Sequence, residues 1–290
     1  EALAQKEPIA LLGDYDVDGI TGTTMLLETL RELGAKDVLP LVPDRFREGY
    51  GLNLHHAQRF LDEGRTLIHT IDNGTTAVEP IAHLQSHGAD VIVLDHHLPM
   101  GEKLPEAFCI VNPNQPSCSS RNKDLCGAGV AWKLCEALTS RAHAAGYLDL
   151  AAAATIADMM NLRGENRILT RLGLDRLRRD PHPVLAVLCE MARIDREHIS
   201  AQTVAFSIAP RINTGHRIPR GAGEENPATA LFFRREGACA RDLEGLLKER
   251  QRLQNMALAE VERALKEQRE QCALVLVARK PGPIGEGIAG

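Results

Sequence analysis

Carboxylates and imidazoles that can bind a metal ion recur at four places in this 290-residue chain. The first is Gly13-Asp14-Tyr15-Asp16-Val17-Asp18-Gly19, in which three aspartates alternate with other residues. The others are Asp72-Asn73-Gly74, Asp95-His96-His97 and Asp158-Met159-Met160. Neighbouring carboxylates repel one another, and a metal or a cationic partner offsets that repulsion. Aspartate and histidine together form a set of metal ligands.

Each of these groups has a plainer interpretation. The acidic run lies between an apolar stretch, Ile9 to Leu12, and a helical pattern from about Thr21 to Leu33. A phosphate-binding turn there would contain glycines and a lysine in place of three acids. The run is therefore either a metal site or a solvated loop with an aspartate capping the helix. Asp95-His96-His97 is either a metal corner or a polar strand end with surface histidines.

Short apolar runs precede the polar groups and predict the strands that position them. Besides Ile9–Leu12, they are Val38–Val42, Leu67–Ile71, Val91–Leu94 and Phe108–Val111, with helical patterns between most of them. This alternation predicts an α/β fold with a doubly wound, mostly parallel sheet. Ligands of such sheets bind beyond the carboxyl ends of the strands. We therefore expect six side chains to converge on one edge: Asp16, Asp18, Asp72, Asp95, His96 and His97.

The second half of the chain predicts a helical extension. The run Cys126-Gly127-Ala128-Gly129-Val130 opens a helix, and its glycines permit either the approach of a substrate phosphate or tight helix packing. A small-residue helix from Leu148 to Ala157 ends at Asp158, whose carboxylate needs a metal or an arginine as partner. Two arginines and an asparagine in Pro210–Arg217 suit phosphate, although a loop with solvated arginines is the alternative.

Composition excludes several classes of protein. Hydrophobic residues make up 44% of the chain and charged residues 25%, as in an ordinary globular protein. We find no apolar run of membrane-spanning length and no signal peptide. The seven cysteines form no C-x-x-C pair, which favours reduced thiols and a cytoplasmic location. The net charge of -5 does not indicate nucleic-acid binding, but local basic patches can coexist with it.

As an ordered set, these motifs resemble the DHH phosphoesterase superfamily and, within it, the RecJ-type exonucleases. The resemblance rests on the four polar groups, the Cys126–Val130 turn and Thr155-Ile156-Ala157-Asp158-Met159. Further similar features are Val111-Asn112-Pro113-Asn114, the Glu165–Leu169 run and Pro210-Arg211-Ile212-Asn213 with Arg217. The resemblance covers about residues 8 to 217 and the long helical pattern that follows them.

The resemblance implies cutting of single-stranded DNA from the 5′ end into mononucleotides, in repair and recombination, with two divalent cations, Mn²⁺ or Mg²⁺. The implied metal ligands are Asp16, Asp18, Asp72, His96 and Asp158, with Asp14 beside them. Asp72 is the expected bridge between cations about 3.5–4 Å apart, with Asp95 and His97 as further catalytic residues. Arg211, Asn213, Arg217, Gly127 and Gly129 are the implied substrate-binding residues. A single-stranded-DNA-binding protein and a RecQ-type helicase are implied partners, and no membrane is.

The resemblance also implies a division of the chain. We expect a catalytic domain over residues 1–226, a connecting helix over 227–271 and the start of an accessory domain over 272–290, so that the chain is a fragment. His216 stands where the family usually has glycine, Asn161 where it has proline, and the 219–227 loop is longer. Another DHH phosphodiesterase, acting on oligoribonucleotides or cyclic dinucleotides, and a non-catalytic replication scaffold are the alternatives.

Overall fold

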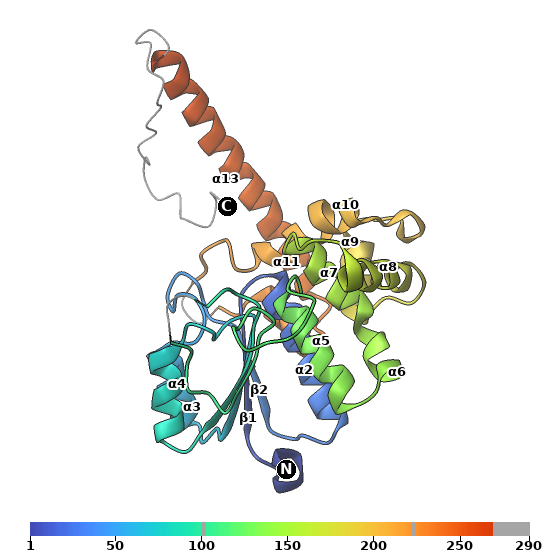
Figure 1. Ribbon diagram of the computed structural model, residues 1–290. Coiled ribbons are helices and arrows are strands. Elements are labelled where there is room, and N and C mark those ends of the chain that lie inside the picture. Colours follow the sequence, from blue (N-terminus) through green and yellow to red (C-terminus); the bar gives the residue numbers. More distant parts are fainter. Residues whose placement is uncertain (100–102, 222–223, 269–290) are drawn as a thin grey trace.

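A five-stranded parallel sheet lies at the centre of the protein, in a computed structural model that describes residues 1–99, 103–221 and 224–268 (Figure 1). The strands have the order β2-β1-β3-β4-β5. Their bounds are β1 Ile9–Gly13, β2 Val38–Leu41, β3 Leu67–Ile71, β4 Asp90–Leu94 and β5 Cys109–Val111. The predicted fold class is confirmed.

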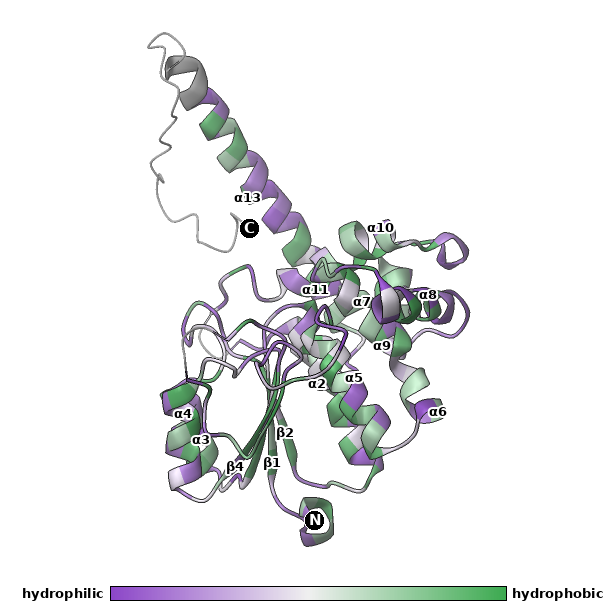
Figure 2. Ribbon diagram, viewed as in Figure 1, coloured by the Kyte–Doolittle hydropathy of each residue, from purple (hydrophilic) through white to green (hydrophobic). Residues whose placement is uncertain are grey.

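Helices cover both faces of the sheet because each strand is apolar on both sides. In β1, Ile9 and Leu11 face one apolar cluster while Ala10 and Leu12 face the other. The first cluster includes side chains of α2 (Val17–Glu32), α5 (Gly127–Leu138) and α7 (Leu148–Ala157). The second includes those of α3 (Leu54–Asp62) and α4 (Val78–Ser86). Figure 2 shows the apolar strands between these helix layers.

The helical extension packs on the α2 and α5 side of the sheet (Figure 1). It comprises α8 Gly164–Arg179, α9 Pro183–Met191, α10 Ala201–Thr203, α11 Ala209–Thr214 and α12 Pro227–Arg234. Helices α7 and α8 pack so closely that a Cβ on Gly173 of α8 would lie 2.2 Å from the Leu148 carbonyl oxygen. This close packing accounts for the small residues of α7. The described residues also form short helical turns, which are α1 Ala2–Gln5, α6 Arg141–Ala144, η1 Ala145–Tyr147, η2 Arg196–His198 and the π turn η3 Val204–Ile208.

The structure corrects two predicted boundaries and confirms a third. Helix α2 begins at Val17 and not near Thr21, because Asp16 caps it. The predicted loop from Pro210 to Arg217 is mostly helix α11, which continues directly from the turn η3. The sequence predicts an interruption of the long helical pattern near Gly237, and this is confirmed, since Arg235 adopts a left-handed conformation after α12 and α13 starts at Cys239 and is described as far as Gln268.

Helix α13 packs with its first turns against α9, α11 and α12 and then extends away from the sheet (Figure 1). The accessory-domain start predicted at residues 272–290 lies outside the described residues. In the described ranges, none of the helices combines the length and the apolar character needed to cross a membrane.

Candidate metal centre

Three acids lie side by side because each directly follows a strand of the sheet. The amides of Asp14, Asp72 and Asp95 continue the strand ladder by donating to the carbonyl oxygens of Ile71, Leu94 and Val111 at 3.1, 2.8 and 3.2 Å. Strand β2 lies on one side of β1, and β3, β4 and β5 follow on the other, so the strand order reverses between β1 and β3. Ligands of doubly wound sheets bind at this switch point.

Asp72 occupies a strained position at this edge. Its backbone has φ 62°, a left-handed conformation that few residues other than glycine adopt. Gly127 at the start of α5 approaches it so closely that a Cβ there would lie 2.5 Å from the Asp72 Cβ. Strain of about 1–3 kcal/mol persists where the surrounding structure requires it, as it does at functional sites.

The acidic run serves both as a helix cap and as part of the cluster. Asp16 Oδ1 accepts hydrogen bonds from the Asp18 and Gly19 amides at 2.9 and 3.2 Å, which begins α2. Asp18 is buried, and its carboxylate accepts from the Gly127 and Ala128 amides at 2.6 and 2.7 Å. The run can therefore cap the helix and bind a metal at the same time, because the hydrogen bonds from backbone amides hold the Asp16 and Asp18 carboxylates in place.

His96 lies among three carboxylates. Its Nε2 is 3.2 Å from Asp72 Oδ1, 3.6 Å from Asp158 Oδ2 and 3.8 Å from Asp18 Oδ2. Asp158 reaches this point from the C-terminal end of α7, where it is the capping residue. Burial lowers the pKa of His96, which favours the neutral imidazole that ligates metals.

Burial and mutual repulsion disfavour ionised carboxylates in this cluster. Burial, followed by the charge of Asp16, raises the pKa of Asp14 to about 8. Burial and the charge of Asp18 raise the pKa of Asp158 to about 7 and that of Asp72 well above its usual value. The buried Oδ1 atoms of Asp14 and Asp72 have no hydrogen-bond partner. Such oxygens are suited to a cation.

The cluster offers three overlapping groups whose ligand atoms lie within 4.8 Å of one another. They are Asp72, His96 and His97; Asp18, His96 and Asp158; and Asp14, Asp16 and Asp72. Asp72 belongs to two groups and His96 to two, so the six residues predicted as ligands all lie in one connected site. Oxygen and imidazole donors of this kind fit Mn²⁺ or Mg²⁺.

Asp95 organises the histidine turn, and its carboxylate is taken up by that turn. It accepts from the amides of Thr75, His96 and His97 at 2.9, 2.7 and 3.1 Å. It also accepts from the His97 ring nitrogen Nδ1 at 2.8 Å. Although burial opposes it, the bond with His97 lowers the pKa of Asp95, and the same bond raises the pKa of His97. The catalytic role predicted for Asp95 stays a prediction, and these contacts favour a role that acts through His97.

The predicted phosphate contacts are only partly available. The Gly127 amide donates to Asp18 and the Gly129 amide to Cys126 Sγ at 3.4 Å, so these glycines serve close packing. Arg211 pairs with Glu244 of α13 at 2.8 Å, and Asn213 Oδ1 accepts from the Val17 amide at 3.0 Å. Arg217 makes no side-chain hydrogen bond or ion pair within the described ranges. Burial and the charge of Asp18 raise the pKa of Asp16, and the charge of Arg217 offsets part of this rise.

The sequence reasoning missed the side chains that support the histidine turn. Asn112 donates to Thr75 Oγ1 at 2.8 Å and to the His97 carbonyl oxygen at 2.9 Å, and Asn114 donates to the His96 carbonyl oxygen at 2.6 Å. Tyr50 donates to the Asp72 carbonyl oxygen at 3.2 Å and packs edge-on against His97. Asparagines directly after β5 were the signal that could have indicated such a role.

A parallel sheet with a carboxylate and histidine cluster at its switch point defines a candidate metal-dependent enzyme. Residues 8–158 match the family model "DHH family, N-terminal domain", and the chain belongs to this family. The resemblance stated from the motifs is thereby confirmed.

Curated relatives with similar sequences are RecJ proteins named single-stranded-DNA-specific exonucleases. The Bacillus subtilis protein is 38% identical over 98% of this chain and 36% of its own length. The Escherichia coli protein is 37% identical over 72% of this chain and 39% of its own. The chain thus spans little more than a third of the length of these relatives.

Two solved RecJ structures have similar folds. A crystal structure of exonuclease RecJ bound to manganese has a TM-score of 0.79 and 37% identity, covering 90% of this chain and 66% of that one. RecJ from Thermus thermophilus in complex with Mn²⁺ also has a TM-score of 0.79, with 34% identity over 100% of this chain and 41% of that one.

Proposed function

We propose that the chain is the catalytic part of a cytoplasmic exonuclease that hydrolyses single-stranded DNA with two divalent cations, Mn²⁺ or Mg²⁺. The observation that carries this proposal is the buried cluster of carboxylates beside His96, in which the Oδ1 atoms of Asp14 and Asp72 accept no hydrogen bond. The similarity to RecJ exonucleases supports the choice of substrate.

Asp72 is the residue that would hold both cations, because it belongs to two of the three ligand groups and its carboxylate offers two oxygens, whereas His96, which also belongs to two groups, would bind one cation through Nε2. Asp14 and Asp16 complete one side of the site, and Asp18, His96 and Asp158 the other. Two bound cations would lower the pKa of a water and offset charge on the phosphate oxygens. The protein contributes fixed ligands, since the backbone amides at the start of α5 hold Asp18 and the cap of α2 holds Asp16.

His97 is the proposed contact to the phosphate group. Its Nδ1 donates to Asp95, which fixes the ring orientation and raises the pKa of the imidazole. The side chain is 46% exposed and therefore accessible to a substrate. A protonated imidazole at this place stabilises negative charge that develops on the reacting phosphate. Arg217 offers a second positive charge near Asp16.

Digestion from the 5′ end to mononucleotides, the role in repair and recombination, and the protein partners rest on the resemblance alone. We propose them on that basis, together with a catalytic domain over residues 1–226 and a connecting segment over 227–271, in which α12 and α13 are separate helices. Helix α13 supports the connecting role, because it extends away from the catalytic sheet (Figure 1).

A turnover assay tests the proposed function. The 290-residue chain is given 5′-phosphorylated single-stranded DNA, duplex DNA, a short RNA and pyrophosphate, each with Mn²⁺, Mg²⁺ or EDTA. We expect mononucleotides from single-stranded DNA with a divalent cation and none in EDTA. Preferential hydrolysis of RNA or pyrophosphate would favour another DHH phosphodiesterase. Failure to bind any divalent cation would favour a non-catalytic scaffold.

A further inference from the structure

The carboxylate of Asp158 is held differently from those of its neighbours at the metal centre. Hydrogen bonds from backbone amides fix the carboxylates of Asp16 and Asp18, whereas that of Asp158 accepts no hydrogen bond within the described ranges. Asp158 also precedes Met159, whose backbone has φ 56°, a left-handed conformation that is unfavourable for a residue other than glycine. The place of the Asp158 carboxylate therefore depends on the contacts that hold the turn after it.

Asn166 of α8 holds this turn. The residue is 1% exposed, and its Nδ2 donates to the carbonyl oxygens of Asn161 and Asp124 at 3.1 and 2.5 Å. Its Oδ1 accepts from Asn122 Nδ2 at 3.3 Å. A second contact joins the same two segments, since Asn161 Nδ2 donates to Asp124 Oδ1 at 3.0 Å. Asn166 thus uses both donors and its acceptor to connect the turn with the segment around Asp124.

The segment from residue 122 to residue 128 also contacts the elements that carry two other metal ligands. At its end, the first amides of α5 donate to the carboxylate of Asp18 at 2.6 and 2.7 Å. Near its start, the Lys123 carbonyl oxygen accepts from Asn114 Nδ2 at 3.3 Å, and the same Nδ2 donates to the His96 carbonyl oxygen at 2.6 Å. One segment is therefore linked to three separate elements of the metal centre.

These three elements carry one complete ligand group, which consists of Asp18, His96 and Asp158. Its members come from α2, from the turn after β4 and from the end of α7, so no single helix or strand fixes their separation. Ligands that are held in place before a cation arrives bind it more tightly, because less ordering accompanies binding.

We propose that Asn166 is a positioning residue of the metal centre, which sets the place of Asp158 relative to the other two members of its ligand group. It acts through the segment from residue 122 to residue 128 and touches no cation itself. The proposal rests on the proposed function in one respect, which is that a divalent cation occupies this group.

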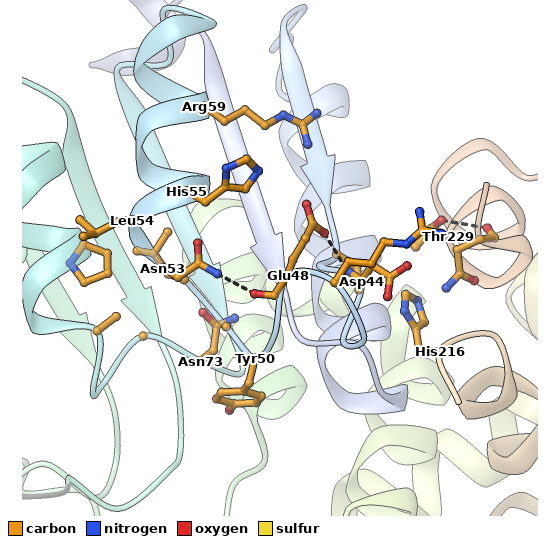
Figure 3. Close-up of a pocket in the computed structure, with 18 of the residues that line it drawn as sticks. Asp44, Glu48, Tyr50, Asn53, Leu54, His55, Arg59, Asn73, His216 and Thr229 are labelled. Atoms are coloured by element: carbon orange, nitrogen blue, oxygen red, sulfur yellow. Dashed lines mark hydrogen bonds between the residues drawn. The ribbon is translucent and has the colours of Figure 1, made fainter. Parts of the chain in front are cut away.

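This network is separate from the cleft drawn in Figure 3. The residues that line the cleft lie within 42–59, 73–80 and 216–229, and Asn114, Asn161 and Asn166 are not among them. A substitution of Asn166 therefore leaves the walls of the cleft unchanged, and a change in cation binding would arise from the ligand group.

Calorimetric titration of Mn²⁺ into the 290-residue chain tests the proposal. We expect N166A to bind one cation at least about tenfold more weakly than the wild type, because loss of the groups that orient metal ligands costs about 10–100-fold in affinity. The matched control is R178A, since Arg178 of the same helix also donates twice to a backbone carbonyl, that of Ile199. Both variants should unfold more easily, but R178A should keep wild-type Mn²⁺ binding.

Hydrogen exchange of the metal-free chain gives a second readout that a purely structural role would not produce. The amides of Met159 and Met160 donate to the carbonyl oxygens of Ile156 and Thr155 at the end of α7. In N166A these two amides should exchange at least about tenfold faster, while those in the middle of α7 stay unchanged. A purely structural role would instead accelerate exchange along α7 and α8 alike.

A second variant keeps the proposal testable if N166A does not fold. N161A removes only the exposed bond to Asp124, and we expect it to weaken Mn²⁺ binding about threefold. Wild-type Mn²⁺ binding by folded N166A would overturn the proposal. So would uniformly faster exchange along both helices, or wild-type binding by N161A where N166A does not fold.

The result is distinguishable from a failure of the proposed function. If the wild-type chain binds no divalent cation, the proposed function fails and the exchange rates still show whether Asn166 holds the turn. If the wild type and N166A bind Mn²⁺ equally well, the metal centre stands and only the role of Asn166 is wrong.

Discussion

Two buried acids of this protein, Asp72 and Asp149, differ in what surrounds them. Asp149 in α7 is fully buried, and its carboxylate accepts from the Leu150 and His182 amides at 3.0 and 2.5 Å, with Arg176 Nε 3.6 Å away. Asp72 is 2% exposed, and its Oδ1 has no hydrogen-bond partner and lies among further carboxylates. Groups of the protein itself supply hydrogen bonds to Asp149, whereas Asp72 Oδ1 is left for a ligand.

This difference shows that burial of a charge does not by itself identify a functional site. The partners of Asp149 come from α7, α8 and the residue before α9, so the carboxylate joins structural elements. The neighbours of Asp72 come from the ends of strands and helices, and the four neighbours Asp14, Asp16, Asp18 and Asp95 have its own charge. The informative feature is the convergence of several like charges, together with the unpartnered oxygens of Asp14 and Asp72.

The largest expected effect is that of Asp72→Asn on catalysis. Removal of the carboxylate proposed to hold both cations should lower kcat for single-stranded DNA by at least about 10³-fold, which corresponds to several kcal/mol of transition-state stabilisation. The free energy of unfolding without metal should rise, because a repelled buried charge is removed. Turnover and denaturant unfolding of the same preparation check this, and near-normal turnover in excess Mn²⁺ would contradict the assignment.

The opposite pattern is expected for Asp149→Asn. The substitution replaces an acceptor of two amide bonds and one arginine contact, so unfolding should become easier by about 2–4 kcal/mol. Turnover per folded molecule should stay within about twofold, because Asp149 lies outside the metal centre. A loss of turnover as large as that of Asp72→Asn would show that the two acids do not differ in function.

Asp95→Asn should have an intermediate effect. The asparagine side chain still accepts hydrogen bonds from the turn, but it has no charge to stabilise protonated His97. We therefore expect kcat to fall about 10–100-fold. The diagnostic readout is the pKa of His97 measured by NMR, which should decrease. An unchanged His97 pKa together with the same fall in kcat would mean that Asp95 acts only through the shape of the turn.

The smallest effect concerns His69, whose unpartnered ring nitrogen lies in the core away from the site. Burial lowers its pKa to about 4, so below pH 6.5 the unfolded chain takes up a proton that the folded chain does not. The difference in unfolding free energy between wild type and His69→Gln should therefore fall by roughly 1–3 kcal/mol from pH 6.5 to 4. A difference that does not change with pH would show that His69 is solvated.

The strands and the metal centre could be predicted because their signals are local. Apolar runs that end in Asp or His mark strand ends, and parallel topology brings those ends together. The contacts of Asp95 could not be predicted in this way, since all four depend on the exact turn geometry. The ion pair of Arg211 in α11 with Glu244 in α13 joins residues that are 33 positions apart in the sequence, and no local pattern specifies such a contact.

The burial of His216 could not be predicted from the sequence. The sequence marks His216 only as a departure from the family pattern, whereas its burial arises in part from its stacking on Tyr15. Unpartnered buried atoms become visible only when all neighbours are placed.

Calorimetric titration of Mn²⁺ into the 290-residue chain and its Asp72→Asn and Asp149→Asn variants tests the central claim most directly. We expect two cations per chain for the wild type and for Asp149→Asn, and at most one weakly bound cation for Asp72→Asn. At a concentration about 100 times the dissociation constant, each bound Mn²⁺ should stabilise the fold by about 2.7 kcal/mol. Equal binding by Asp72→Asn, or no binding by the wild type, would contradict the proposal that this cluster is a two-cation catalytic centre.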